Sequence, residues 1–315
     1  MEVRVKIPIG GVAFFDSGVG GLTVLNACQK RLAGEKFYYY GDNERAPYGS
    51  LPPTQIERYV KEAFDLFEQL QVKCAVVACN TVTALCVDGL RARYSFPIIG
   101  AEPAVVSAAK RGGEVFVLTT RATFESQRFH LLCEKVQTKY PLAKLTAYAC
   151  EGLAGEIETH FCDAFYDFTE RLPRGSPDAV VLGCTHYVYI RERIKKFYNC
   201  EVFDGNEGIA QRLCGLLRQN SACKEQNFTS ETAGSEKNRD GRPLFQKSMG
   251  EVGIFDHLLS RNAEIKKLGT KTNKCSYIKT RKSRIIPSIK AKNEIYFLGS
   301  GADKNKHFCE RMFEF

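Results

Sequence analysis

The sequence predicts an α/β fold with mainly parallel sheets flanked by helices. Short apolar runs alternate with amphipathic stretches of helical periodicity, and eight such units precede residue 220. The apolar runs lack strict polar alternation, which is typical of parallel strands covered by helices on both faces of the sheet. Eight units fit either two α/β lobes or a single barrel.

The predicted elements follow one another in a regular order. Predicted strands, rich in β-branched and aromatic residues, span residues 11–15, 36–42, 74–78, 96–100, 114–120, 143–150, 178–183 and 200–205. Each precedes a predicted amphipathic helix, at residues 21–32, 54–70, 81–94, 104–111, 123–137, 153–172, 187–197 and 209–219. A last strand is predicted at 293–301 and a short helix at 306–315.

The segment 220–292 interrupts this order and carries the net charge. It holds 16 basic residues (Lys and Arg) and 7 acidic residues (Asp and Glu). The rest of the chain has 29 basic and 29 acidic residues, so the whole net charge of +9 belongs to this segment. We expect 220–292 to be a basic insertion or linker that is mobile. Its most basic part, 266–292, is either a solvated run without a partner, which we favour, or a nonspecific nucleic-acid-binding segment.

Composition argues against several other classes of protein. No apolar run approaches the length of about 18 residues that a membrane-spanning helix needs. The first residues lack the order of a signal peptide, so a cytoplasmic protein without a membrane partner is expected. The 13 cysteines include no CxxC pair and are scattered through apolar segments, which argues against a disulfide framework or a metal site.

Three predicted strand-to-helix corners carry reactive or polar residues: Asp-Ser-Gly at 16–18, Cys-Asn-Thr at 79–81 and Cys-Thr-His at 184–186. In parallel sheets such corners share the carboxyl edge, where ligands bind. Each also begins a helix, whose free N–H groups favour anions and lower the pKa of a cysteine thiol. Helix capping explains Asp16 or Thr81 taken singly, but two cysteines at matching corners predict a shared site.

The two matched thiols predict proton transfer on both faces of one carbon atom. A single Cys with a His suits acyl transfer. Two thiols on opposite faces suit a reaction in which one removes a proton while the other delivers one. Such a reaction inverts a stereocentre and requires no cofactor.

The motifs AFFDSGVGGLTVL, YYGDNERAPYGS, VVACNTVTA, PIIGAEPAV and VVLGCTHY together resemble those of bacterial glutamate racemases, in the aspartate/glutamate racemase superfamily. The resemblance covers residues 11–219 and extends to 294–315. It implies cofactor-independent interconversion of L- and D-glutamate, which supplies D-glutamate for peptidoglycan. It also implies two pseudo-symmetric lobes with the substrate glutamate between them.

The resemblance assigns roles to individual positions. Cys79 and Cys184 match the catalytic cysteines, with Cys79 deprotonating D-glutamate and Cys184 deprotonating L-glutamate. Asp16 and His186 match auxiliary acid/base groups, and Glu151 is matched to a further acidic catalytic position. The implied substrate-binding residues are Asp16, Ser17, Tyr48, Gly49, Asn80, Thr81, Thr185 and His186.

We expect residues 1–97, 209–219 and 293–315 to form the first lobe and residues 98–208 the second. The insertion at 220–292 departs from the family, in which a short link joins the helix to the last strand. The alternatives are an aspartate racemase or another amino-acid racemase of the superfamily, and a bifunctional protein whose basic segment binds nucleic acid. Formation of a homodimer is left open.

Overall fold

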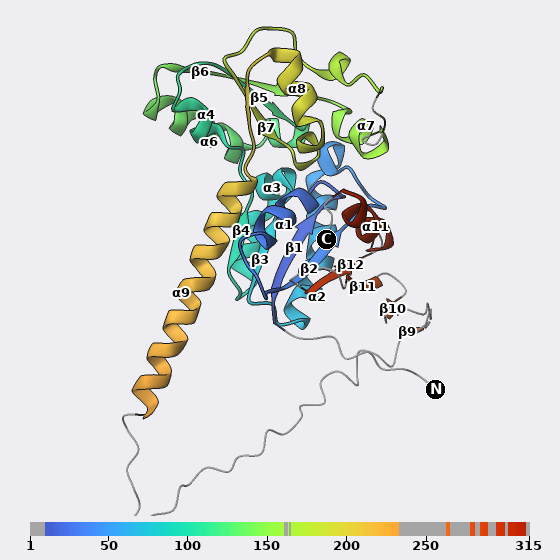
Figure 1. Cartoon of the computed structure of the whole chain (residues 1–315), viewed down its shortest axis with the longest axis vertical. Helices are drawn as coiled ribbons and strands as arrows, with labels where there is room; N and C mark the ends of the chain where they lie inside the picture. Colours follow the sequence, from blue (N-terminus) through green and yellow to red (C-terminus); the bar gives the residue numbers. More distant parts are fainter. Residues whose placement is uncertain are drawn as a thin grey trace, which may run out of the picture.

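The computed structural model describes residues 10–160, 163, 165–232, 263–264, 278–280, 284–288, 294–299 and 302–312. These residues form two α/β lobes stacked along the long axis of the molecule (Figure 1). Each lobe has its own mainly parallel sheet with helices on both faces. The predicted fold class is confirmed, and the chain forms two lobes rather than one barrel.

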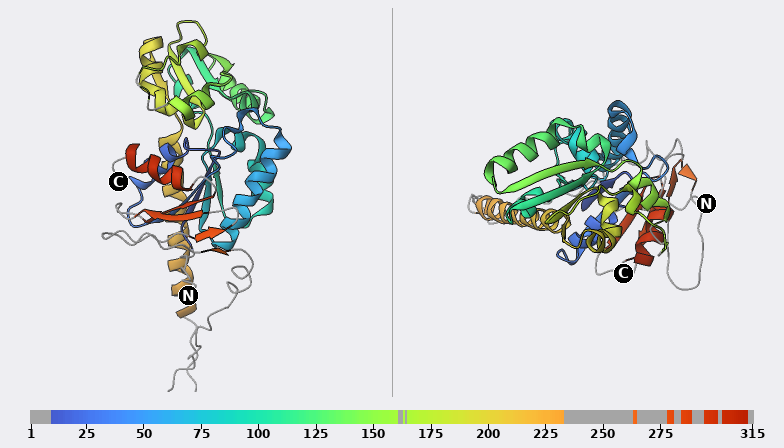
Figure 2. Two further views of the ribbon diagram at one scale, coloured as in Figure 1. Left: turned by 90° about the vertical axis from the view of Figure 1, so that its right-hand side faces the viewer. Right: turned by 90° about the horizontal axis from the view of Figure 1, so that it is seen from above.

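The first lobe contains a sheet whose described strands have the order β4-β3-β1-β2-β12-β11-β10-β9. The parallel strands are β1 (Val12–Asp16), β2 (Lys36–Gly41), β3 (Cys74–Val77), β4 (Ile98–Gly100) and β12 (Glu294–Leu298). Helices α2 (Pro53–Gln69) and α3 (Asn80–Arg93) cover one face. The other face packs against α1 (Leu22–Gln29), α9 (Asn206–Thr232) and α11 (Ala302–Met312), and Figure 2 shows α11 and α2 on opposite sides of the strands.

The side chains of β1 explain why this strand shows no polar alternation. Val12 and Phe14 point into the core beneath α1 and α9, whereas Ala13 and Phe15 point into the core beneath α2 and α3. All four side chains are fully buried. A strand that is covered on both faces has no solvent-facing positions to fill with polar residues.

The second lobe is built on the parallel sheet β6-β5-β7-β8. Its strands are β5 (Gly113–Thr119), β6 (Ala143–Ala149), β7 (Ala179–Gly183) and β8 (Glu201–Phe203). Helices α4 (Val105–Ala109) and α6 (Gln127–Lys139) cover one face. The other face packs against α7 (Leu153–His160), the 3-10 helix η3 (Thr185–Ile190) and α8 (Arg191–Tyr198).

The boundary between the lobes lies later than we expected. β4, assigned above to the second lobe, pairs in parallel with β3 and forms the edge of the first sheet. A β-strand, the helix α3 and a parallel strand make the usual crossover unit, which keeps β4 beside β3. The chain therefore passes to the second lobe after Gly100, and it returns through α9, which begins at Asn206 and packs against α1.

The segment 220–292 is described only in part. Helix α9 continues to Thr232, and β9 (Ala263–Glu264), β10 (Ile278–Thr280) and β11 (Arg284–Ser288) extend the first sheet in antiparallel pairs. The linker interpretation is wrong for these strands, because β11 hydrogen-bonds the edge of β12 that would otherwise lack a partner. The other residues of the segment, including most of 266–292, lie outside the described residues. Within the described residues, none of the helices combines the length and the apolarity needed to span a membrane.

Candidate active site

The three corners predicted from the sequence meet where the two lobes face each other. Asp16 ends β1, Cys79 is the N-cap of α3, and Cys184 is the N-cap of η3. The Thr185 hydroxyl from the second lobe donates to Asp16 Oδ2 of the first lobe at 3.1 Å. This hydrogen bond joins the carboxyl edges of the two sheets. The predicted juxtaposition of the corners is therefore present in the structure.

On the first-lobe side, a thiol lies beside a hydroxyl and close to a carboxyl group. Cys79 Sγ is 3.7 Å from Ser17 Oγ. Asp16 accepts a hydrogen bond from the backbone N–H of Gly18 at 2.9 Å, in addition to the one from Thr185. All of these side chains are buried, and Asp16 is completely inaccessible to solvent. Cys79 and Asp16 thus share an enclosed polar region in which their charges influence each other.

On the second-lobe side, a thiol, an imidazole and a carboxylate form a chain. Cys184 Sγ is 3.8 Å from His186 Nδ1, and His186 Nε2 is 2.6 Å from Glu158 Oε2. His186 is buried between these two partners. An imidazole with a thiol on one nitrogen and a carboxylate on the other can, when protonated, stabilise the thiolate form of that thiol.

Glycines in the loop after β1 allow the lobes to approach this closely. A Cβ atom on Gly18 would lie 3.0 Å from Glu158 Oε2 and 3.2 Å from His186 Nε2, and one on Gly20 would collide with the Thr185 side chain. Neither glycine has a positive φ. They are therefore required by the close contact between the lobes and not by an unusual backbone conformation.

A second contact between the lobes is made by threonine hydroxyl groups. Thr81 Oγ1 and Thr120 Oγ1 are 2.9 Å apart, and the Thr120 hydroxyl donates to Thr123 Oγ1 at 3.1 Å. Thr120 follows β5 and caps the short helix α5 (Arg121–Phe124). It lies at a fourth strand-to-helix corner, which is marked in the sequence by Thr119 and Thr120 but is not among the predicted site residues.

Asn80 and Gly49 also reach the interface between the lobes, but the side chain of Tyr48 does not. Asn80 is buried at the first position of α3. A Cβ atom on Gly49 would lie 2.8 Å from Thr120 Cβ. In contrast, the Tyr48 hydroxyl donates to the buried Asp42 carboxylate. Any contact of the loop at 48–49 with a ligand would therefore use its backbone.

Burial raises the pKa of the acidic groups on the first-lobe side. The carboxyl group of Asp16 has a pKa raised to about 6 by desolvation, although the charge of His186 and the hydrogen bond from Gly18 act against this shift. Desolvation, reinforced by the negative charge of Asp16, raises the pKa of Cys79 to about 12. We expected the helix N-terminus to lower the pKa of this thiol, and that expectation is wrong for Cys79. The hydrogen bond from the α3 backbone does lower it, but burial outweighs that effect.

The His186–Glu158 pair has the opposite character. Burial alone would lower the pKa of His186, yet its hydrogen bonds to Cys184 and Glu158 outweigh burial and hold its pKa well above the usual value. Burial alone would raise the pKa of Glu158, but the hydrogen bonds from His186 and Lys304 lower it to about 2. The pair is therefore an imidazolium and a carboxylate at neutral pH.

Glu151 does not occupy the position that we assigned to it. Its side chain is 58% exposed and forms a salt bridge with Arg121 at 2.7 Å. The carboxylate that contacts His186 is that of Glu158, which lies seven residues after Glu151. Glu158 lies inside a predicted amphipathic helix, where a lone acidic residue gives no local signal. Its role depends on how α7 packs against η3, which the sequence pattern does not specify.

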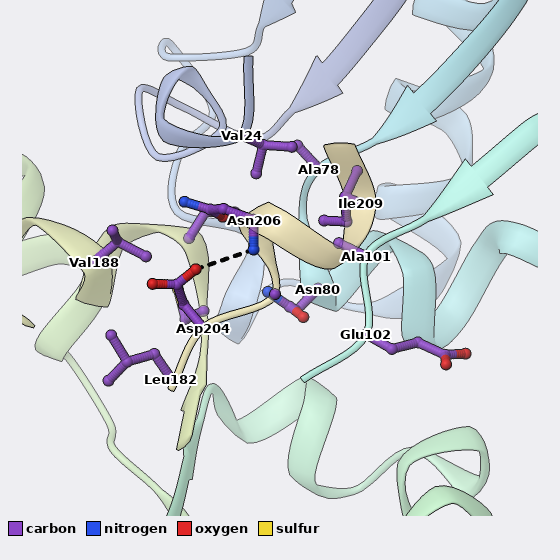
Figure 3. Close-up of a pocket in the computed structure, with 13 residues that line it drawn as sticks. Val24, Ala78, Asn80, Ala101, Glu102, Leu182, Val188, Asp204, Asn206 and Ile209 are labelled. Carbon is purple, nitrogen blue, oxygen red and sulfur yellow. Dashed lines mark hydrogen bonds between the residues drawn. The ribbon is translucent and has the colours of Figure 1, made fainter. Parts of the chain in front are cut away.

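Cavities of different sizes border this region. The first has a volume of about 10 Å³ and is lined by 13 residues from both lobes, including Asn80, Cys184 and Asp204. Figure 3 shows Asp204 beside it, accepting a hydrogen bond from the Asn206 backbone at 3.0 Å. This space is about the size of one water molecule and is too small for an amino acid.

The second cavity has a volume of about 320 Å³ and lies at the rim of the lobe interface, where it is lined by Gly49, Thr120 and Glu151 among others. Thr120 also belongs to the hydroxyl contact between the lobes. Among the described residues there is no group of three or more His, Cys, Asp or Glu side chains placed to hold a metal ion.

Comparisons with known proteins agree with this arrangement. A family model described as Asp/Glu/Hydantoin racemase matches residues 21–213. Glutamate racemase from Clostridium botulinum (strain Kyoto / Type A2) is 34% identical over 230 aligned positions, and the alignment covers 70% of this chain and 87% of that protein.

Solved structures show the same likeness. Escherichia coli glutamate racemase, in complex with L-glutamate and the activator UDP-MurNAc-Ala, is 28% identical with a TM-score of 0.60, over 67% of this chain and 83% of that one. Glutamate racemase from Francisella tularensis subsp. tularensis SCHU S4, in complex with D-glutamate, is 26% identical with a TM-score of 0.57, over 67% of this chain and 82% of that one.

Proposed function

Because the chain belongs to the Asp/Glu/Hydantoin racemase family and is similar to glutamate racemases, we propose that it interconverts L- and D-glutamate by two-base proton transfer between Cys79 and Cys184. One observation carries the mechanism. Two buried thiols come from opposite lobes to one interface, and each has its own polar partner there. A stereocentre placed between them would meet one thiol on each face.

The second-lobe thiol is suited to remove a proton. The His186 imidazolium lies against Cys184 and stabilises the thiolate form of this cysteine, and the Glu158 carboxylate in turn stabilises the imidazolium. The resulting thiolate takes the Cα proton of L-glutamate. The electron pair of the broken C–H bond remains on the substrate as a carbanion, next to its own carboxylate.

The first-lobe thiol is suited to deliver a proton. Its raised pKa keeps Cys79 protonated until a carbanion forms on the adjacent face. Transfer of the thiol proton to Cα then gives D-glutamate and leaves a Cys79 thiolate. Asp16, with a pKa of about 6, is the nearby acid that can restore the proton. In the reverse direction the Cys79 thiolate takes the proton from D-glutamate and Cys184 supplies one.

The remaining polar side chains suit the charged groups of an amino acid. Ser17, Asn80, Thr81 and Thr185 present hydroxyl and amide groups at the lobe interface. Together with the backbone of the loop at 48–49 they form the proposed binding set for the substrate. The cavity beside Gly49 and Thr120 is the proposed entry, and the lobes must separate to admit glutamate. We place the reaction in the cytoplasm, where it would supply D-glutamate for peptidoglycan.

The test combines solvent exchange with two single variants. In deuterated water the wild type should convert either enantiomer of glutamate to the racemate and introduce deuterium at Cα. Cys79→Ala and Cys184→Ala should each abolish racemisation, because a turnover requires both groups. Cys79→Ala should still exchange the Cα hydrogen of L-glutamate, and Cys184→Ala that of D-glutamate.

Three outcomes would contradict the proposal. Full racemisation by either single variant would exclude the two-base mechanism. Comparable turnover of aspartate would favour the alternative, a racemase of broader specificity within the superfamily. Loss of activity on dialysis that is reversed by an added cofactor would contradict cofactor-independent chemistry.

A further inference from the structure

A lysine from the C-terminal helix of the first lobe reaches the histidine–carboxylate pair of the second lobe. Lys304, near the start of α11, places Nζ 2.8 Å from Glu158 Oε1. Glu158 lies on α7, and Figure 1 shows α11 and α7 facing each other at the junction of the lobes. The ion pair therefore crosses the interface next to the proposed site.

The two oxygens of Glu158 have different partners. Oε2 is 2.6 Å from His186 Nε2, and Oε1 accepts from Lys304. A carboxylate held at both oxygens cannot rotate freely about its last bond. The side chain of Glu158 is only 10% exposed, whereas that of Lys304 is 50% exposed. Lys304 thus closes the solvent side of a buried carboxylate and fixes the oxygen that faces His186.

Helix α11 is held firmly enough to position this lysine. The adjacent residue Asn305 is completely buried, donates to the Gly41 carbonyl at 3.3 Å and accepts from Asn43 Nδ2 at 2.8 Å. One turn further on, Phe308 packs into the core of the first lobe. The backbone of Lys304 is therefore tied to the carboxyl end of β2, beside the loop that carries Gly18.

We propose that Lys304 is a positioning residue for proton transfer through Cys184, acting by orienting Glu158 toward His186. This inference rests on the proposed racemase function. Lys304 touches neither thiol, so it acts through the chain from Glu158 to His186 to Cys184. The role is confined to the second-lobe face of the substrate, since Cys79 has separate partners in Ser17 and Asp16.

The charged and titratable groups around Glu158, His186 and Cys184 determine which electrostatic interactions Lys304 can change. His186 faces Cys184 and Glu158 and is influenced by Asp16. Glu158 faces His186 and Lys304, with the hydroxyl groups of Tyr39 and Tyr189 close enough to interact electrostatically. Among these, Lys304 is the cation contributed by α11. Its removal leaves Glu158 Oε1 without its lysine partner.

The experiment compares Lys304→Met with Lys304→Arg and with a matched control, Lys73→Met. Lys73 pairs with Glu35 at the same distance of 2.8 Å, and its side chain is 48% exposed, but the pair lies away from the thiols. Rates are measured in both directions with Cα-protonated and Cα-deuterated glutamate. The pKa of His186 is measured separately by NMR, which requires no activity.

The proposal predicts an asymmetric result. For Lys304→Met, kcat should fall about fivefold with an unchanged KM, a size expected for a half-exposed ion pair. The deuterium isotope effect should increase with L-glutamate, where Cys184 removes the proton, and should not increase with D-glutamate. The pKa of His186 should fall, because a less well oriented carboxylate stabilises the imidazolium less. Lys304→Arg should restore these values, and Lys73→Met should behave as wild type.

Several results would overturn the inference. Equal changes of the isotope effect in both directions would indicate general structural damage. Identical behaviour of Lys304→Met and Lys73→Met, or an unchanged or raised pKa of His186, would remove the positioning role. If the wild type itself fails to racemise glutamate, the proposed function fails instead, and the NMR titration alone then decides whether Lys304 controls the histidine pair.

Discussion

Replacing Asp16 by Asn should make the protein more stable at neutral pH while it abolishes activity. Asp16 is fully buried, and desolvation raises its pKa from 3.8 to about 6. A shift of this size corresponds to about 3 kcal/mol. An acid whose pKa is raised on folding contributes its full stability below the unfolded pKa and loses it as the pH rises through the folded pKa. The wild type should therefore lose about 3 kcal/mol between about pH 4 and pH 6 through this group alone.

The amide side chain of the Asp16→Asn variant does not titrate, so the stability of the variant should not contain this loss. The amide can keep the hydrogen bond from Gly18, and the Thr185 hydroxyl can turn to accept from the amide nitrogen. The difference in free energy of unfolding between Asp16→Asn and wild type should shift by about 3 kcal/mol in favour of the variant from about pH 4 to about pH 7. Urea unfolding followed by circular dichroism at several pH values measures this difference.

Asp65, in the same lobe, provides a control for which the stability difference between variant and wild type should change with pH in the opposite direction. Desolvation alone would raise the pKa of Asp65, but the hydrogen bonds from Lys61 and Tyr94 and the nearby cations together outweigh it and lower the pKa. Asp65→Asn should therefore become less stable relative to wild type as the pH rises from about 3 to 5. The reasoning is refuted if the stability difference for Asp16→Asn does not change with pH, or if it changes in the same direction as for Asp65→Asn.

Three further predictions follow from the site and the insertion. Glu158→Gln should lower kcat/KM for glutamate about a hundredfold, since the buried partner of the imidazolium loses its charge; Glu151→Gln should change it less than about threefold. Gly20→Ala should destabilise the contact between the lobes by about 1 to 3 kcal/mol in thermal unfolding, whereas Gly215→Ala, within a helix and without near neighbours, should be neutral or stabilising. Deletion of 222–290 should leave racemisation intact and abolish any salt-sensitive binding to nucleic acid.

The controls in these experiments decide between local and general effects. Equal losses for Glu158→Gln and Glu151→Gln would mean that the exposed carboxylate matters as much as the buried one. A neutral Gly20→Ala would show that the lobes do not approach as closely as described. Loss of both folding and activity in the deletion variant would mean that the described strands β10 and β11 are required for the first lobe.

The succession of strands and helices along the chain and the meeting of the two cysteine corners could be predicted from the sequence, because local patterns and the matching residues at the corners indicate them. Apolar runs identify the strands, and parallel strands end at a common edge. This rule places Cys79 and Cys184 at the carboxyl edges of their own sheets, and the matching residues at the two corners predict that these edges form one site.

Other features of the site depend on contacts between segments that are distant in the sequence, and the sequence pattern does not reveal such contacts. Glu158 is a site residue because α7 packs against η3, and Lys304 because α11 lies against α7. Glu151 follows a strand directly, as the cysteines do, yet its side chain points to solvent. The pKa of Cys79 was predicted with the wrong sign, because the depth of burial, which outweighs the helix N-terminus, is set by the lobe interface.

The position of β12 in the first sheet has a consequence for biosynthesis. Strands β5 to β8 come from one continuous stretch, so the second lobe can fold as soon as it has left the ribosome. The first lobe cannot, because β12 must insert between β2 and β11, and its codons are translated after those of the whole insertion. A nascent chain halted within the insertion would carry the Cys184–His186–Glu158 group in a folded lobe, facing an unfinished partner. Racemase activity should therefore arise only with translation of the last strand and helix, however early Cys79 itself was made.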